Sequence, residues 1–245
     1  MASKRLSRYI PPEHGAWAML IVPFALGTFS ATPSWPSLLL LVAWLAVYLT
    51  SYFGLRWWKT RTLSHRGVRF RAPTLLYASL LAVSGAILLV LEPWLVFAGI
   101  AFLPFESTAV ALAIRGKERS LPAGFASATA ACLMAPVAYR LADGDDWTLA
   151  LTLFVVSWLA FTGSVLHVKS TIRERDDPRY RTASIAFHAL ALIAATWIKP
   201  LLVIPFGFLL VRAVVVPRHG WRPAQIGAVE IAGSLLVLAV PLVAL

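Results

Sequence analysis

Long apolar segments, separated by short polar ones, occupy most of the 245-residue chain. A helix needs about twenty apolar residues to cross the hydrocarbon core of a bilayer, where only helices and closed barrels satisfy their backbone hydrogen bonds. The pattern therefore predicts an all-α fold, a polytopic bundle of about nine transmembrane helices. The expected spans are 16–31, 38–55, 74–91, 94–114, 122–141, 147–166, 182–197, 200–216 and 226–245.

Proline residues punctuate this pattern. Several stand close to the ends of the expected helices, where a missing backbone N–H is tolerated best. Pro104 instead lies inside the span 94–114 and predicts a kink two residues before Glu106. The prolines expected at helix edges are Pro33, Pro36, Pro73, Pro93, Pro122 and Pro200.

Composition supports the membrane interpretation. The chain is 59% hydrophobic and 13% charged, and its mean hydropathy is +0.76, which is far from the mixture found in soluble domains. A net charge of +11 would suggest a nucleic-acid partner in a soluble protein. Here the basic residues lie in the gaps between apolar runs, so they indicate contact with anionic inner-leaflet lipids and no nucleic acid.

The basic residues also predict the topology. With the N-terminus in the cytoplasm, 20 of the 22 Lys and Arg fall in cytoplasmic segments, and only Arg140 and Lys199 fall outside. This asymmetry predicts a multi-pass membrane protein with an extracytoplasmic C-terminus. The N-terminus resembles a signal peptide, but the polar sequence 11–15 favours its retention.

The positions of the two longest basic loops, 56–71 and 167–181, suggest a faint internal repeat within one integral membrane domain, 1–245. Each loop would join the second and third helices of a four-helix half. The expected halves are 10–119 and 120–222, with the last helix, 223–245, appended.

Ionisable residues inside the expected spans gather near one depth. Glu106, His188 and Glu230 lie seven to nine residues from the nearest cytoplasmic arginine, which is roughly 10 to 14 Å at 1.5 Å per residue. Buried ionisable groups usually face a cavity or the bundle interior. Together with Glu13 and His14 at the first helix, they predict a polar chamber open to the cytoplasm.

Structural roles compete with this interpretation. Glu106 could pair with Arg115 or His188 and lock two helices together. A buried hydrogen bond would explain His188 equally well, and Glu230 could lie among the headgroups if the last helix began later.

Cationic side chains stand at the ends of two expected helices. Arg56 and Lys59 are expected to share one helical face, and His167, Lys169 and Arg173 another, from spacings of three or four residues such as 56/59 and 169/173. Two such faces could bind phosphate or diphosphate without a metal. The alternative is that these charges only set the topology.

Two segments resemble the YwiC-like family of bacterial integral membrane proteins. They are Ile-Pro-Pro-Glu-His-Gly-Ala-Trp-Ala-Met at 10–19 and Ile-Arg-Glu-Arg-Asp-Asp-Pro-Arg-Tyr-Arg at 172–181. The likeness extends over the whole chain. It implies an integral membrane protein but brings no established molecular activity with it.

The layout also resembles the UbiA superfamily of intramembrane prenyltransferases, which place their chemistry in the loops after helices two and six. Those enzymes bind magnesium diphosphate through aspartate motifs. Here the first location, 50–58, contains no acid, and Glu174, Asp176 and Asp177 lack the spacing of the second motif. Magnesium is therefore not expected, and no other cofactor or metal site is indicated because the five histidines lie on different elements.

Three functions remain open. The chain could bind an isoprenoid phosphate or another lipid with an anionic head, and Glu106 and His188 would then be the candidates for catalytic acid or base. It could instead be a proton-coupled transporter of a small anion or lipid, with the same two residues carrying the proton. Thirdly, the basic loops could dock a partner protein in a noncatalytic assembly.

Overall fold

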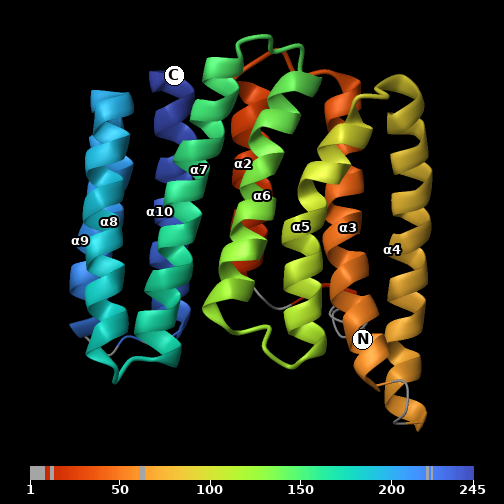
Figure 1. Ribbon diagram of the computed structural model, residues 1–245, viewed down its shortest axis with the longest axis horizontal. Helices are drawn as coiled ribbons and strands as arrows, with labels where there is room; N and C mark the ends of the chain where they lie inside the picture. Colours follow the sequence, from red (N-terminus) through yellow and green to blue (C-terminus); the bar gives the residue numbers. More distant parts are fainter. Residues whose placement is uncertain (1–8, 12–13, 61–63, 219–220, 222) are drawn as a thin grey trace. The chain divides into compact units, whose positions relative to one another are not determined.

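The structure, a computed structural model, describes residues 9–11, 14–60, 64–218, 221 and 223–245, without the side chains of residues 14, 64–67, 218 and 223. The described residues form nine α-helices, one π-helix and two 3₁₀ turns, and no strand (Figure 1). Seven of these helices are long and apolar enough to cross a membrane, and the other two are shorter. The all-α fold is confirmed, and the chain is a multi-pass integral membrane protein.

Each described α-helix coincides with one expected span. The helices are α2 (His14–Phe29), α3 (Trp35–Thr60), α4 (Ser64–Leu91), α5 (Leu95–Ile114), α6 (Leu121–Leu141), α7 (Trp147–Val168), α8 (Pro178–Ile198), α9 (Val203–Val215) and α10 (Pro223–Ala244). The π-helix η1 (Lys169–Arg173) follows α7, and the 3₁₀ turns η2 (Pro200–Leu202) and η3 (Val216–Arg218) flank α9.

The expected basic loop 56–71 is mostly helical, which corrects the sequence-based boundary. The helix α3 continues to Thr60, and α4 already begins at Ser64. Arg and Lys are good helix formers, and their long side chains can reach water from a helix that emerges from the membrane. Pro73 consequently lies inside α4 rather than at its edge.

The chain divides into two compact units, which are described separately. Unit 1 comprises residues 1–14 and 33–123, and unit 2 comprises residues 15–32 and 124–245. The helices α3, α4 and α5 belong to unit 1, whereas α2 and α6 to α10 belong to unit 2. The first helix of the expected first half thus packs with the second half, and the internal repeat stays a prediction.

In unit 1, α3 packs along α4 through aromatic rings. Phe53 stacks on Tyr77 with ring centroids 5.9 Å apart, and Trp44 of α3 contacts Phe102 of α5 at 5.6 Å. The Tyr77 hydroxyl donates a hydrogen bond to the Tyr9 carbonyl oxygen at 2.8 Å. This bond attaches Tyr9, which precedes the first described helix in the sequence, to α4.

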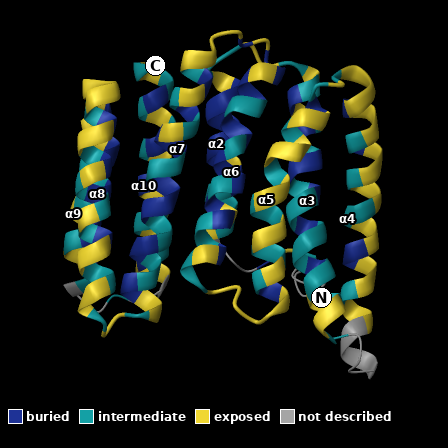
Figure 2. Cartoon of the chain, in the orientation of Figure 1, coloured by how far each residue is buried: buried dark blue, intermediate teal, exposed yellow. Residues whose placement is uncertain are grey.

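In unit 2, the core lies between the helices and consists of tightly packed small and branched side chains. Val156 and Phe206 are buried there together with Cys132 and Val237. The opposite sides of the helices carry exposed apolar residues, such as Trp197 and Val243. Exposed residues are yellow in Figure 2. Exposed apolar surface of this extent is what a lipid-facing helix requires.

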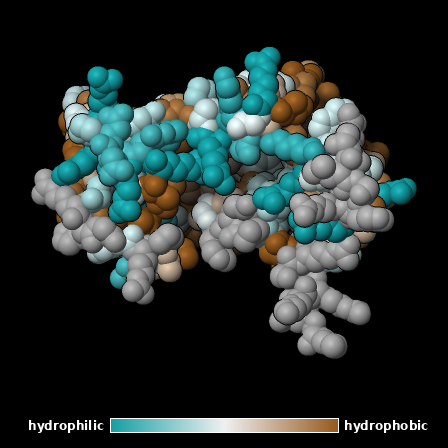
Figure 3. Space-filling model, turned by 90° about the horizontal axis from the view of Figure 1, so that it is seen from below, coloured by the Kyte–Doolittle hydropathy of each residue, from teal (hydrophilic) through white to brown (hydrophobic). Residues whose placement is uncertain are grey.

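Within each unit, the connections with most basic residues come at one end of the helices. In unit 2 these are the segments 169–181 and 216–218, while Arg140 and Lys199 lie at the other end. Seen from below, many of the described residues at the surface are hydrophilic (Figure 3). The arrangement suits the expected topology, whose sidedness stays a prediction.

Gly27 provides a test of helix packing in unit 2. It is buried in α2, where an added Cβ would collide with the Ala135 carbonyl oxygen of α6. The backbone cannot move aside as a flexible side chain can. We therefore expect Gly27→Ala to lower the free energy of unfolding by about 1–3 kcal/mol. Gly207→Ala is the matched control, because a Cβ there meets nothing within 4 Å. Thermal unfolding in detergent measures both, and equal melting temperatures would contradict the packing.

Candidate functional site

Four helices of unit 2 each place one ionisable side chain at the same end of the bundle. The helices α7 and α9 end there, and α8 and α10 begin there (Figure 1). The four residues are His167 of α7, His188 of α8, Arg212 of α9 and Glu230 of α10, and together they are called the polar cluster below.

Arg212 and Glu230 form the centre of the polar cluster. The Arg212 side chain is 1% exposed and the Glu230 side chain 16% exposed, and Arg212 Nη1 lies 2.5 Å from Glu230 Oε1. Both Nη atoms of Arg212 also donate to the Ser164 hydroxyl of α7 at 3.4 Å. A buried guanidinium is tolerated only when it is paired and hydrogen-bonded in this way.

His188 is held from both sides of its ring. Its Nδ1 lies 2.7 Å from the Ser184 carbonyl oxygen, and its Nε2 lies 3.1 Å from Arg212 Nη2. A guanidinium can only donate, so Nε2 must accept and Nδ1 must carry the proton. In this arrangement His188 is a neutral imidazole with no lone pair left for a ligand.

A glycine makes room for this imidazole. Gly163 of α7 faces the His188 ring, and an added Cβ there would lie 2.9 Å from Nε2. Small residues let membrane helices approach closely, which is how α7 and α8 bring the ring to Arg212.

His167 differs from His188 in its partners. The residue is fully buried, and its Nε2 lies 3.6 Å from Glu230 Oε1, which is within ion-pair range but too long for a hydrogen bond. Neither ring nitrogen of His167 makes a hydrogen bond to any residue that the structure describes. Its ring centroid lies 6.4 Å from that of His188.

The backbone at His167 marks a change of helix type. The hydroxyls of Ser170 and Thr171 donate to the His167 carbonyl oxygen at 2.9 and 2.6 Å, and the π-helix η1 begins at Lys169. Single π turns within helices occur frequently at functional sites. Here the π turn leads directly from the polar cluster into the basic loop.

The chemistry of the polar cluster follows from its charges. Arg212 and Glu230 neutralise each other, and two imidazoles flank the pair. Among the described residues no three His, Cys, Asp or Glu side chains are placed to hold a metal ion, and a guanidinium stands between His188 and Glu230. Binding of an anion, rather than of a cation, is what such a donor set favours.

Two other expected binding residues lie beyond the polar cluster in unit 2. Lys169 Nζ is 3.4 Å from a Glu174 carboxylate oxygen and 5.5 Å from the centre of the Tyr180 ring. Arg173 is the last residue of η1. Both lie at the end of unit 2 where α7 ends and α8 begins, which the sequence predicted to be the cytoplasmic end.

Arg56 and Lys59 lie in α3 of unit 1. The Arg56 guanidinium stacks 4.2 Å from the Tyr52 ring centre, and Lys59 Nζ lies 3.2 Å from Glu118 Oε2. A hydrogen bond from its own backbone and another from Lys59 lower the pKa of Glu118. Because the two units are described separately, the expected meeting of both cationic faces stays a prediction.

The remaining expected residues are placed as follows. Glu106 is half-buried in α5 of unit 1, so its pairing with His188 of unit 2 also stays a prediction. His14 is the first residue of α2, but its side chain lies outside the description, as does all of Glu13.

Sequence reasoning missed Arg212 and Ser164 as site residues. The topology count had assigned Arg212 to a cytoplasmic loop, whereas it is buried in α9. The signal was present, because Arg212 falls inside the expected apolar span 200–216. A cation within a span is a stronger indication of a site than one between spans.

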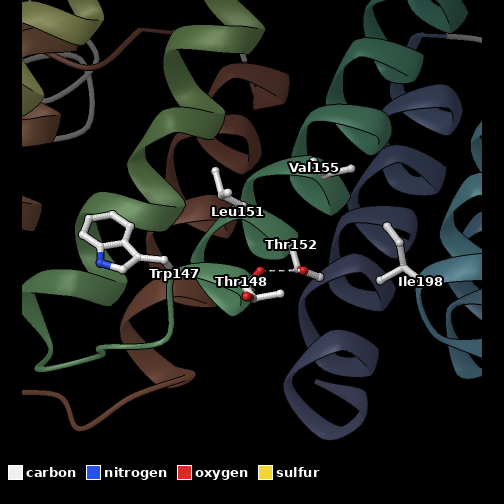
Figure 4. Close-up of a pocket in the computed structure, with 6 residues that line it drawn as sticks. All are labelled: Trp147, Thr148, Leu151, Thr152, Val155 and Ile198. Carbon is white, nitrogen blue, oxygen red and sulfur yellow. Dashed lines mark hydrogen bonds between the residues drawn. The ribbon is translucent and has the colours of Figure 1, made fainter.

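A separate apolar pocket lies where α7 begins and α8 ends, at the other end of unit 2. Its volume is about 400 Å³, and its lining contains no ionisable group. The Thr152 hydroxyl is already satisfied by the Thr148 carbonyl oxygen at 2.8 Å (Figure 4). The pocket is lined by Trp147, Thr148, Leu151, Thr152, Val155 and Ile198.

The buried ion pair predicts a strongly coupled effect on stability. Arg212→Met leaves the Glu230 carboxylate buried without its partner, so we expect a loss of about 3–5 kcal/mol. The double variant Arg212→Met, Glu230→Met should recover most of this loss, because it removes both charges together. Unfolding of the variants in detergent tests the coupling, and additive losses would show that the two residues are not paired.

Comparison with known proteins agrees with the resemblance in the sequence. The family model described as YwiC-like protein matches residues 10–139. An uncharacterized protein of Haemophilus influenzae is 30% identical over 236 residues, covering 96% of this chain and 98% of that protein. The uncharacterized protein YwiC of Bacillus subtilis is 31% identical over 241 residues, covering 94% and 95%. No solved structure matches. This chain belongs to the YwiC-like family.

Proposed function

We propose that this protein binds an anionic group, either a small anion or the head of a lipid such as an isoprenoid phosphate, at Arg212. The observation that supports it most directly is the position of Arg212, a nearly fully buried cation already facing a carboxylate. The proposal places the protein in the bacterial inner membrane with its N-terminus in the cytoplasm, so that the anion reaches the polar cluster from the inner leaflet or the cytoplasm.

In this proposal Glu230 occupies the ligand's position on Arg212 when no ligand is bound. Its carboxylate occupies Arg212 as a bound carboxylate or phosphate would, and Arg presents paired donors that match the oxygens of both groups. Binding then requires Glu230 to leave Arg212. Its side chain is the more exposed member of the pair, which suits this movement.

The surroundings favour an anion over other ligands. Lys169, Arg173 and Arg175 lie on the segment that directly follows α7, at the same end of unit 2 as the polar cluster. Over residues 169–181 there are five Lys or Arg and three acids, and this net charge of +2 raises the local concentration of anions. Glu174 lies 3.4 Å from Lys169, and Asp176 and Asp177 offset two further positive charges of the segment.

The first experiment measures binding of formate, a monovalent planar carboxylate, to the purified protein by calorimetry. Arg212→Gln should abolish binding, because the ligand loses its paired donors. Glu230→Gln should tighten binding by about ten- to hundredfold, because it removes the carboxylate that competes with the ligand for Arg212. This factor corresponds to the free energy of a hydrogen bond between charged groups. Arg140→Gln is the matched control, since Arg140 bonds the Gly144 carbonyl oxygen at the other end of unit 2. Undiminished binding in Arg212→Gln contradicts the proposal.

A second experiment separates the two sources of the anionic group. Farnesyl phosphate and inorganic phosphate share the same head, but only the first carries an apolar tail. For a lipid ligand we expect at least about a hundredfold tighter binding of farnesyl phosphate, because each buried CH₂ contributes about 0.8 kcal/mol. Equal affinities would identify a soluble anion. In both cases Arg212→Gln should remove the binding of the phosphate head.

A further inference from the structure

We infer that His167 takes up one proton each time an anion binds at Arg212. The inference rests on the proposed function and concerns the same site. It would make the polar cluster a proton-coupled anion site with one proton for each monovalent anion.

Counting charges leads to this conclusion. In the structure Arg212 and Glu230 cancel, and His188 must be neutral because its Nε2 accepts from Arg212. A bound anion therefore leaves the polar cluster with one excess negative charge. An uncompensated charge among buried side chains is expensive, so a proton from solvent should accompany the anion.

Among the imidazoles and the guanidinium of the polar cluster, the geometry identifies His167 as the group that receives this proton. The groups that face it are His188 from α8, Arg212 from α9 and Glu230 from α10, while Lys169 of η1 pairs with Glu174. Both nitrogens of His188 are occupied, and Arg212 cannot accept. His167 has two ring nitrogens without a hydrogen bond among the described residues.

Protonated His167 would also receive Glu230. The carboxylate displaced from Arg212 needs a new partner, and His167 Nε2 is already 3.6 Å from Glu230 Oε1. A short side-chain movement would turn this contact into a hydrogen-bonded ion pair. The same proton then neutralises the added charge and holds Glu230 away from Arg212.

The test measures formate affinity and proton uptake together, in weakly buffered protein with a pH indicator. For the wild-type protein we expect one proton per formate, with the Kd rising about tenfold for each pH unit between pH 6 and 8. His167→Gln should show no uptake and no pH dependence, and at pH 6 it should bind as weakly as the wild-type protein at high pH. Uptake that persists in His167→Gln would overturn the inference.

A double variant distinguishes charge compensation from a structural role. Glu230→Gln removes the negative charge, so formate then restores neutrality with Arg212 and needs no proton. His167→Gln, Glu230→Gln should therefore bind formate as tightly as Glu230→Gln alone. If the double variant stays weak, His167 only supports the fold and the inference fails. If neither the wild-type protein nor Glu230→Gln binds formate, the proposed function itself fails.

Discussion

Burial of one guanidinium constrains the organisation of unit 2. Arg212 could not lie inside α9 unless other helices supplied an opposite charge and hydrogen-bond acceptors at the same depth. Glu230, His188 and Ser164 supply them from α10, α8 and α7. Four helices are thereby fixed in register at one end, in a medium where apolar contact alone gives little preference for one register over another.

The same constraint separates the two kinds of surface on these helices. Residues that face the interior are small where helices approach, as at Gly163, Ala191 and Ala195, and the helices can therefore come close. Residues that face outward are large and apolar, as at Trp197. Polar groups are thus concentrated where four helices can supply their hydrogen-bond partners. The lipid-facing residues named above carry no polar group that needs such a partner.

The nine α-helices of the described residues could be predicted from the sequence because bilayer thickness imposes a length on every apolar run. His188 and Glu230 could be selected as candidates because ionisable groups are rare in such runs, and His167 because it stands beside Lys169 at the end of an expected helix. Arg212 could not be recognised by the same reasoning once it had been counted toward topology. Neither could its pairing with Glu230 be foreseen, since helix neighbours depend on packing that residue spacing does not encode. For Arg56, Lys59 and Glu106 in unit 1 the expected roles stay predictions.

The π turn after α7 has a consequence for evolution of the basic loop. The Glu174 N–H donates to the Lys169 carbonyl oxygen across five residues, so the turn accommodates one residue more than an α-helical turn would. One residue added within an α-helix is enough to produce a turn of this width. Insertion or deletion of a residue at 169–173 would therefore change the direction of the basic loop, while the His167 imidazole, two residues before the π turn, kept its place in the bundle.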